Sequence, residues 1–449
     1  MNRFAHFGLA CLCGLFLLSP ASIHGQEKPL GIPATDEGVP GAGPIRRSEG
    51  FHKTWDGRRA AFAKTAAMEG GSLVVFGDSI TQGWGGRLAK HFPGAKIANR
   101  GISGDTTRGM LYRLQDDVLN LDPTGVVMLM GTNDLAEGAT AEQIVGNIKL
   151  MILQMKAKNP SIAIVLCTMF PSSSTKDRPA EKIKEVNSAL LAAVKGDSSV
   201  IVVDAWSMFA DADGNAPAAL FPDLLHLNDA GYEKWANALR PVLETYMLVP
   251  VPADDFQPES GFVSLFNGKD LTGWGVQATA EETIKQRENV LKKNPNGPVW
   301  PIFKESKAFD GQIASDDGRY VVRNGRIVVM TPSEGRRIQT LSTTKEFPKD
   351  FTLRLEFRAT PNADSGVFLR KPQLQCRDYT VAGPYKNLKS YKPQDWNVLE
   401  VVATGGTARC TCNGEVLEEA FKIPETGPIG LEGDRGQMEY RRIRIKTEG

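Results

Sequence analysis

The sequence predicts two folded domains of different class, an α/β domain followed by an all-β domain. The chain of 449 residues is too long for one ordinary hydrophobic core. In its first half, short runs that are apolar throughout alternate with helical patterns, which is typical of a parallel sheet covered on both faces. In its second half, apolar and polar residues alternate one by one, as in half-buried antiparallel strands. Residues 249–259, with three prolines, are expected to be the linker between them.

The elements of the first domain, residues 51–248, follow from its alternating pattern. A helix is expected over residues 51–68, with Phe51, Trp55 and Phe62 among its apolar contacts. Strands are expected at 73–76, 96–99, 125–130, 162–168 and 200–204, and further helices at 106–119, 141–158, 178–195 and 229–247. Five such strands separated largely by helices predict a flavodoxin-like, doubly wound parallel sheet.

The second domain, residues 260–449, has the periodicity of antiparallel strands. Apolar and polar side chains alternate over residues 351–358, and the Asn-Gly pairs at 324–325 and 413–414 are expected to form tight hairpin turns. Further strands are expected at 367–369, 396–402 and 441–445. The pattern predicts an antiparallel sandwich, into which the charged, partly helical residues 281–307 are inserted.

The N-terminal residues are expected to direct export. Residues 1–25 contain a short apolar run followed by small residues, which predicts a cleaved signal peptide and a periplasmic or extracellular protein. Residues 26–50 are rich in Pro and Gly and are expected to be a flexible lead-in. Beyond the signal peptide no segment reads as a membrane span, so we expect no integral membrane domain.

Charge and cysteine content narrow the possible partners. Lys and Arg number 53 against 52 for Asp and Glu, so no global field favours binding to nucleic acid. Cys167 is expected to be a buried thiol, and a disulfide from Cys376 to Cys410 or Cys412 is left open. No spacing indicates a metal site, and no nucleotide-binding motif occurs, so neither metal nor cofactor is expected. The sequence does not give the oligomeric state.

Four polar motifs carry the chemistry of the first domain. Residues 77–79, 101–105 and 131–134 each follow an expected strand directly, so they meet at the carboxyl edge of the sheet. The fourth motif contains Asp223 and His226, and His226 is the one histidine among five with an aspartate three residues before it. A serine hydroxyl becomes a nucleophile when an imidazole takes its proton and a carboxylate orients that imidazole. The motifs therefore predict a serine hydrolase.

In chain order, Gly-Asp-Ser-Ile at 77–80, Gly-Ile-Ser-Gly-Asp at 101–105, Gly-Thr-Asn-Asp at 131–134 and Asp-x-x-His at 223–226 resemble the four sequence blocks of the SGNH (GDSL-type) hydrolases. Residues 99–114 are particularly similar to the platelet-activating-factor acetylhydrolase catalytic-subunit branch and to related bacterial esterases. The G-x-S-x-G motif of the α/β-hydrolases is absent, which disfavours that fold.

The resemblance implies a role for each site residue. Ser79 would attack an ester carbonyl after His226 takes its proton, and Asp223 would orient His226. The oxyanion of the tetrahedral intermediate would be bound by the backbone N–H groups of Ser79 and Gly104 and by the side-chain amide of Asn133. Taken singly, Ser79 could instead be a helix N-cap and Gly104 a turn residue.

Residues 262–274, 365–370 and 427–431 resemble the 3-keto-disaccharide hydrolase domain, a concanavalin-like jelly roll. The resemblance implies an association with carbohydrate, either as a catalyst or as a binding module. Members often carry Glu-x-Gln where this chain has Gln-Leu-Gln at 373–375, and the domain contains no histidine. Independent catalysis by this domain is therefore in doubt.

Three side chains of the second domain are candidate sugar contacts. Arg370 and Gln375 offer polar groups for sugar hydroxyls, and Trp396 offers a flat ring for a sugar face. The alternatives are a core position for Trp396 and a surface strand position for Arg370.

Together the two resemblances predict an exported esterase that removes acetyl or other short acyl groups from carbohydrate, with the jelly roll binding the glycan. One alternative is a lipid or lysophospholipid esterase. Another is a glycan-binding protein with a vestigial site. A third is cleavage of 3-keto-glycosides by the C-terminal domain.

Overall fold

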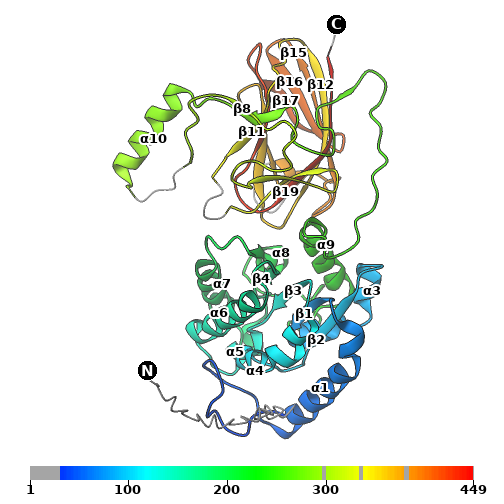
Figure 1. Ribbon diagram of the computed structural model, residues 1–449, viewed down its shortest axis with the longest axis vertical. Coiled ribbons are helices and arrows are strands. Elements are labelled where there is room, and N and C mark those ends of the chain that lie inside the picture. The colour runs from blue at the N-terminus through cyan, green and yellow to red at the C-terminus, as the bar shows by residue number, and fades with distance from the viewer. Residues whose placement is uncertain (1–30, 296–299, 333–336, 379–383, 448–449) are drawn as a thin grey trace, which may run out of the picture.

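A computed structural model describes residues 31–295, 300–332, 337–378 and 384–447 (Figure 1). The predicted signal peptide at residues 1–25 lies outside these ranges. Within them an α/β domain precedes a β-sandwich, which confirms the predicted fold classes. No helix in the described ranges has the length and apolar character needed to cross a bilayer.

The first domain is built on a five-stranded parallel sheet in the order β2-β1-β3-β4-β5. The strands are β1 (Leu73–Gly77), β2 (Ile97–Gly101), β3 (Gly125–Leu129), β4 (Ala163–Cys167) and β5 (Val200–Val203). Strands β1, β3 and β4 are buried at every position, which explains why they are apolar throughout. Because β1 lies between β2 and β3, the loops that follow these three strands are neighbours at the carboxyl edge.

Helices cover both faces of this sheet, as a doubly wound fold requires (Figure 1). The α-helices of this domain are α1 (Glu49–Glu69), α2 (Ser79–Trp84), α3 (Arg87–His91), α4 (Thr107–Asp117), α5 (Thr132–Ala136), α6 (Ala141–Lys158), α7 (Ala180–Ala193), α8 (Ala205–Phe209) and α9 (Asp229–Thr245). Helices α4, α6 and α7 pack against the face that carries Val74 and Phe76. Helices α2, α3 and α9 pack against the face that carries Val75.

The segment ahead of α1, residues 31–48, is hydrogen-bonded to side chains of the first domain. The Arg108 guanidinium donates to the carbonyl of Gly43 at 2.9 Å, and the Thr106 hydroxyl donates to that of Pro44 at 2.7 Å. Asn147 exchanges two hydrogen bonds with the backbone of Ala42, at 2.8 and 3.0 Å. These side chains satisfy backbone groups that Pro and Gly leave outside regular structure, so the segment is held without a strand or helix of its own.

The second domain is a sandwich of two antiparallel sheets. One sheet has the order β17-β16-β15-β12-β19-β10-β9 with β6 paired to β19, and the other has the order β14-β13-β18-β11-β7-β8. The strands are β6 (Val263–Ser264), β7 (Trp274–Val276), β8 (Lys307–Ala308), β9 (Tyr320–Arg323), β10 (Arg326–Val329), β11 (Thr340–Thr343), β12 (Phe351–Ala359), β13 (Asp364–Leu369), β14 (Gln373–Arg377), β15 (Asn397–Thr404), β16 (Thr407–Cys412), β17 (Glu415–Lys422), β18 (Ile429–Glu432) and β19 (Met438–Thr447). One apolar core lies between the two sheets.

Local features of the sandwich follow the sequence closely. Asn324 and Asn413 have φ values of 50° and 49° and each precedes a glycine of positive φ, the backbone of the predicted hairpin turns. The inserted segment contains helix α10 (Glu281–Lys293), which buries no residue. Cys376, Cys410 and Cys412 are free, buried thiols, so the disulfide left open by the sequence is not formed.

The two domains meet at the C-terminal end of α9. The Glu244 carboxylate lies 2.9 Å from the Arg326 guanidinium and 2.7 Å from that of Arg358, both on the sandwich. Glu439 of β19 contacts the same two arginines at 2.8 and 2.7 Å. All four side chains are at most 6% exposed. Burial would raise the pKa of Glu439, but the two guanidiniums hold it below its usual value. The interface therefore contains a compensated, buried set of charges.

Candidate active site

The nucleophile candidate lies where β1 turns sharply into α2. Ser79 is the first residue of α2, and Asp78 caps the helix by accepting the N–H of Ile80 at 2.9 Å. A Cβ at Gly77 would come within 2.3 Å of the Leu129 carbonyl oxygen on β3, so only glycine fits there. The close packing of β1 and β3 thus fixes where the Ser79 side chain begins.

Ser79, His226 and Asp223 form a continuous hydrogen-bonded line. His226 Nε2 lies 2.9 Å from Ser79 Oγ, and His226 Nδ1 lies 2.7 Å from Asp223 Oδ2. Ser79 and His226 are 147 positions apart in the chain and meet because the loop before α9 returns over the carboxyl edge. The imidazole and the carboxylate are 43% and 47% exposed as side chains, so substrate and water can reach them.

The Asp-x-x-His loop holds its own geometry. The Asp223 Oδ1 atom accepts the backbone N–H groups of Leu225 at 3.1 Å and of His226 at 2.7 Å, while Leu224 takes a left-handed φ of 62°. Partial burial raises the pKa of the Asp223 carboxyl, but the hydrogen bonds from His226 outweigh it and lower the pKa to about 2. The carboxylate is therefore ionised over the working pH range and keeps the proton of the imidazole on Nδ1.

The two other predicted donors lie in neighbouring loops at the same edge. Gly104 follows β2 with a φ of 86°, and within the described chain its N–H donates to no protein acceptor. Asn133 follows β3 and is 4% exposed. Its Nδ2 donates to the carbonyl of Asp105 at 2.9 Å, which ties the two loops together. The structure thus brings all five predicted residues of the first domain to one edge of the sheet.

Side chains that the sequence motifs did not single out hold these loops in place. Gln82, one turn after Ser79, accepts the N–H of Ser103 at 2.7 Å. Arg178, in the loop before α7, donates to Asn133 Oδ1 at 3.2 Å. Both act across long sequence distances and belong to no recognisable motif. No sequence signal could have identified Arg178, because a single arginine before a helix is normally a surface residue.

Buried carboxyl groups surround the site. Burial raises the pKa of Asp78 to about 6, against the hydrogen bond from Ile80, and raises that of Asp134 to about 6, against bonds from Thr107. Burial likewise raises the pKa of Asp105 to about 7, although Arg113 donates to it at 2.7 Å. Within the described ranges no three His, Cys, Asp or Glu side chains are grouped to hold a metal ion.

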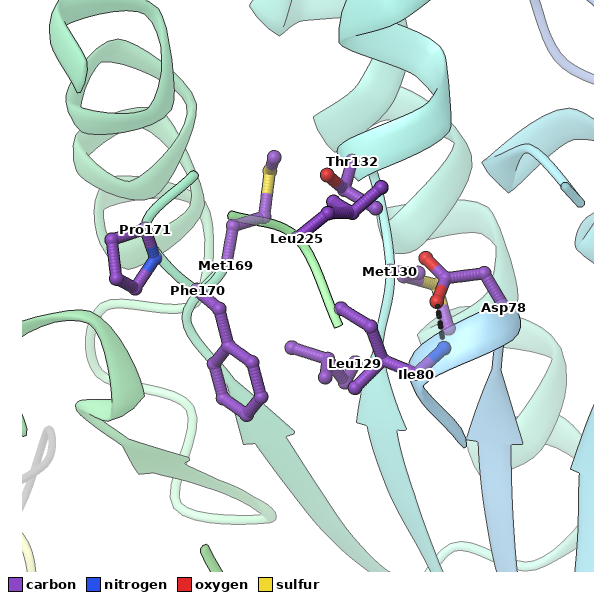
Figure 2. Close-up of a pocket in the computed structure, with 9 residues that line it drawn as sticks. All are labelled: Asp78, Ile80, Leu129, Met130, Thr132, Met169, Phe170, Pro171 and Leu225. Atoms are coloured by element: carbon purple, nitrogen blue, oxygen red, sulfur yellow. Dashed lines mark hydrogen bonds between the residues drawn. The ribbon is translucent and has the colours of Figure 1, made fainter. Parts of the chain in front are cut away.

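A small apolar cavity adjoins the nucleophile (Figure 2). Its volume is about 10 Å³, close to what one water or methyl group needs. Leu225 covers it from the Asp-x-x-His loop, Met169 and Phe170 line it from the end of β4, and Ile80 lines it from α2. Beside Gly104, an open groove of about 590 Å³ is lined mainly by polar residues, most of them from the N-terminal segment and α1. The residues around the site therefore line one tight apolar cavity and one wide polar groove.

The structure does not support Arg370 as a sugar contact. This side chain is 6% exposed, and its guanidinium donates to the carbonyls of Phe347, Pro424 and Lys349 at 2.8, 2.7 and 2.7 Å. The residue has a left-handed φ of 65°, which turns the end of β13 inward. Arg370 therefore joins loops of the sandwich, and neither a sugar contact nor a surface strand cation describes it.

Gln375 and Trp396 lie on different sheets of the sandwich. Gln375 is a half-buried residue of β14, where it accepts a hydrogen bond from Arg377. Trp396 precedes β15 and is half-buried beside a cavity of about 240 Å³ at the junction with α9. The Arg441 and Arg358 guanidiniums lie 3.9 and 4.7 Å from its ring centroid. The three candidate sugar contacts thus do not form one site.

Gln373, which stands where a Glu is frequent in the resembling family, donates to the Glu432 carboxylate on β18 of the same sheet. Burial raises the pKa of Glu432 to about 7, and the nearby Asp434 and Asp364 carboxylates add to this rise. A carboxyl group is therefore present beside the Gln-Leu-Gln run, contributed by β18 and not by β14.

Comparison with known proteins agrees with this geometry. Residues 75–234 match the GDSL-like Lipase/Acylhydrolase family, and residues 261–446 match the 3-keto-alpha-glucoside-1,2-lyase-like domain. The human platelet-activating factor acetylhydrolase IB subunit alpha1 is 28% identical over 226 residues, covering 49% of this chain and 91% of that protein.

Two solved structures resemble the first part of this chain. A GDSL-like lipase from Bacteroides thetaiotaomicron is 26% identical and covers 41% of this chain and 98% of its own, with a TM-score of 0.37. A lipase/acylhydrolase from Enterococcus faecalis is 23% identical and covers 41% and 99%, with a TM-score of 0.31. On the family matches, the first domain belongs to the GDSL-like lipase/acylhydrolase family and is a hydrolase acting on esters, and it is followed by a 3-keto-alpha-glucoside-1,2-lyase-like domain.

Proposed function

We propose that the protein is an exported serine esterase that hydrolyses acetyl or other short acyl esters of carbohydrate. The type of reaction is supported by the hydrogen-bonded arrangement of Ser79 Oγ, the His226 imidazole and the Asp223 carboxylate, with contacts of 2.9 and 2.7 Å. In this mechanism His226 Nε2 takes the hydroxyl proton as Ser79 Oγ bonds to the ester carbon. Asp223 stabilises the imidazolium that forms.

The second half of the cycle uses the same groups. The tetrahedral intermediate carries an oxyanion, which the N–H groups of Ser79 and Gly104 and the amide of Asn133 stabilise. His226 returns the proton to the leaving alcohol oxygen as the carbon–oxygen bond breaks. A water molecule, deprotonated by His226, then attacks the acyl-serine and releases the carboxylic acid with free Ser79.

The asymmetry of the site supports a short acyl group and a polar alcohol. A cavity of about 10 Å³ beside Ser79 has room for a methyl group and not for a long chain. The groove of about 590 Å³ beside Gly104 is lined by Arg46, Ser48 and Thr54, which suit a hydroxyl-rich leaving group. The 3-keto-alpha-glucoside-1,2-lyase-like domain supports carbohydrate as that alcohol.

Hydrolysis of acetylated polysaccharides by the full chain, with labelling by a fluorophosphonate probe, tests the proposal. Both signals should disappear in Ser79→Ala and persist in Ser207→Ala, a serine that bonds a carboxylate but no histidine. Absence of labelling in the intact protein would refute the serine mechanism and would favour a glycan-binding protein with a vestigial site.

A lipid esterase is the second candidate, because the human relative is named for the acetylhydrolysis of a platelet-activating factor. An acetyl group fits the small cavity whether the substrate is a saccharide or a lipid, so the two candidates differ in the alcohol that the ester carries. A higher kcat/KM on acetylated phospholipid than on acetylated saccharide would replace our substrate assignment and leave the mechanism intact. Turnover of a 3-keto-glycoside by the full-length Ser79→Ala variant would show a separate activity in the second domain.

A further inference from the structure

Arg178 is a buried cation that touches the Asn133 loop at several atoms. It is 6% exposed and lies in the loop before α7, 45 positions from Asn133. Its Nε donates to the Thr132 carbonyl at 2.8 Å and to the Thr132 hydroxyl at 2.9 Å. Its Nη2 donates to Asn133 Oδ1 at 3.2 Å, and its Nη1 donates to the Lys176 carbonyl. One side chain therefore joins the loop after β3 to the loop after β4.

The contact with Asn133 fixes which way the amide points. A guanidinium can only donate hydrogen bonds, so the oxygen of the Asn133 amide must face Arg178. The amide nitrogen then faces the opposite side, where one of its two N–H groups donates to the Asp105 carbonyl at 2.9 Å. Its second N–H donates to no acceptor in the described part of the chain. If the Asn133 amide were flipped, Nδ2 would face the Arg178 guanidinium, a second donor, and Oδ1 would face the Asp105 carbonyl oxygen, a second acceptor. Both hydrogen bonds would then be lost.

We propose that Arg178 is a positioning residue of the oxyanion hole, which orients the Asn133 amide so that its free N–H faces the developing oxyanion. The inference rests on the proposed function and adds to it a residue outside the four sequence blocks. A positive charge bonded to the amide oxygen also polarises the amide and strengthens the N–H as a donor in a buried site. Arg178 therefore stabilises the oxyanion indirectly, through the Asn133 amide, and does not contact it.

The electrostatic surroundings are consistent with this role. Burial lowers the pKa of the Arg178 guanidinium, the Asp78 carboxylate raises it, and Arg46 lowers it. Asp78 is the residue before Ser79, so the positive charge of Arg178 lies within electrostatic reach of the nucleophile. Arg178 also braces two loops, and a purely structural role has to be separated from a positioning role.

A double-mutant cycle in the full-length protein separates the two roles. Arg178→Met should lower kcat on a small acetyl ester about 10- to 100-fold, with KM changed less than about twofold, because the amide donates well only in the transition state. In an Asn133→Ala background the same substitution should cost less than about threefold. The rate of fluorophosphonate labelling should follow the same pattern. Arg370→Met, which removes another buried arginine bonded to three carbonyls, should leave kcat unchanged.

Equal losses from Arg178→Met in both backgrounds, or no loss of kcat in either, would overturn the inference. If Arg178→Met does not fold, Arg178→Lys is measured in the same cycle, since it keeps the charge but cannot reach Thr132 and Asn133 together. An intact chain with no esterase activity and no labelling would refute the proposed function and the inference with it. An active wild type with additive losses would refute only the role of Arg178.

Discussion

Enlarging the apolar cavity beside Ser79 should relax the acyl-length limit of the enzyme. The cavity of about 10 Å³ has room for a methyl group, and Leu225 is a half-buried loop residue that lines it. Leu225→Ala removes the branched end of that side chain without opening the core. Each methylene that enters an apolar pocket is worth about 0.8 kcal/mol, so a butyryl chain, two methylenes longer than acetyl, should gain about 1.6 kcal/mol, or about 15-fold in kcat/KM.

The assay compares kcat/KM on 4-nitrophenyl acetate, butyrate and hexanoate. Wild type should prefer acetate, Leu225→Ala should raise the butyrate-to-acetate ratio about 15-fold, and Leu224→Ala should keep the wild-type ratio. Leu224 is the matched control, because it is the adjacent half-buried leucine and does not line the cavity. An unchanged ratio in Leu225→Ala, or the same change in both variants, would show that the acyl group binds elsewhere.

Three further outcomes are expected. Asn133→Ala should lower kcat about 100-fold or more. Asn228→Ala, which removes the N-cap of α9, should keep kcat and lower the free energy of unfolding in urea by about 1 kcal/mol. Similar kcat values for the two variants would contradict the oxyanion assignment. The pKa of Asp78 is raised from 3.8 to about 6, so its contribution to the free energy of unfolding is complete below pH 3.8 and is lost as the pH rises through 6. Between pH 4 and pH 8 the stability of Asp78→Asn should therefore rise by about 3 kcal/mol relative to that of wild type. A stability difference that does not depend on pH would count against a buried, titrating Asp78. Glu244→Gln should destabilise the protein by about 3 to 5 kcal/mol in urea unfolding, because two buried arginines lose a carboxylate partner. Asp254 is a partly exposed partner of Arg442, so Asp254→Asn should destabilise the protein much less. Equal losses of stability would argue against a buried interface.

The sheet could be predicted from sequence because its physical cause is local. Strands such as 125–129 are buried on both faces and are therefore apolar throughout, and the motifs that follow them must meet at one edge. Ser79, Gly104 and Asn133 could be placed together for that reason. His226 needed a further argument, since its loop follows α8 and precedes α9 without coming from a strand end.

The rest depends on contacts that no local pattern encodes. Arg178 bonds residues 45 and 46 positions away, and its side chain is buried only because the loops after β3 and β4 are adjacent. Arg370 looked like a polar group on a strand, but its left-handed backbone directs it into the sandwich. The Pro- and Gly-rich lead-in has the composition of a flexible segment, but its backbone groups find partners in side chains far along the chain, among them Thr106, Arg108 and Asn147.

Helix α9 connects the two domains in a way that the linker sequence conceals. Its N-terminal end follows His226 directly, while near its C-terminal end Glu244 shares a buried charge cluster with Arg326, Arg358 and Glu439. Cutting the chain at residues 249–259 would leave two buried arginines of the sandwich facing water with half of their carboxylate partners removed, and would expose the end of the helix beside the catalytic loop. The unit of sequence homology is therefore smaller than the unit of cooperative folding, and full-length protein should unfold in one transition where two independent modules would give two.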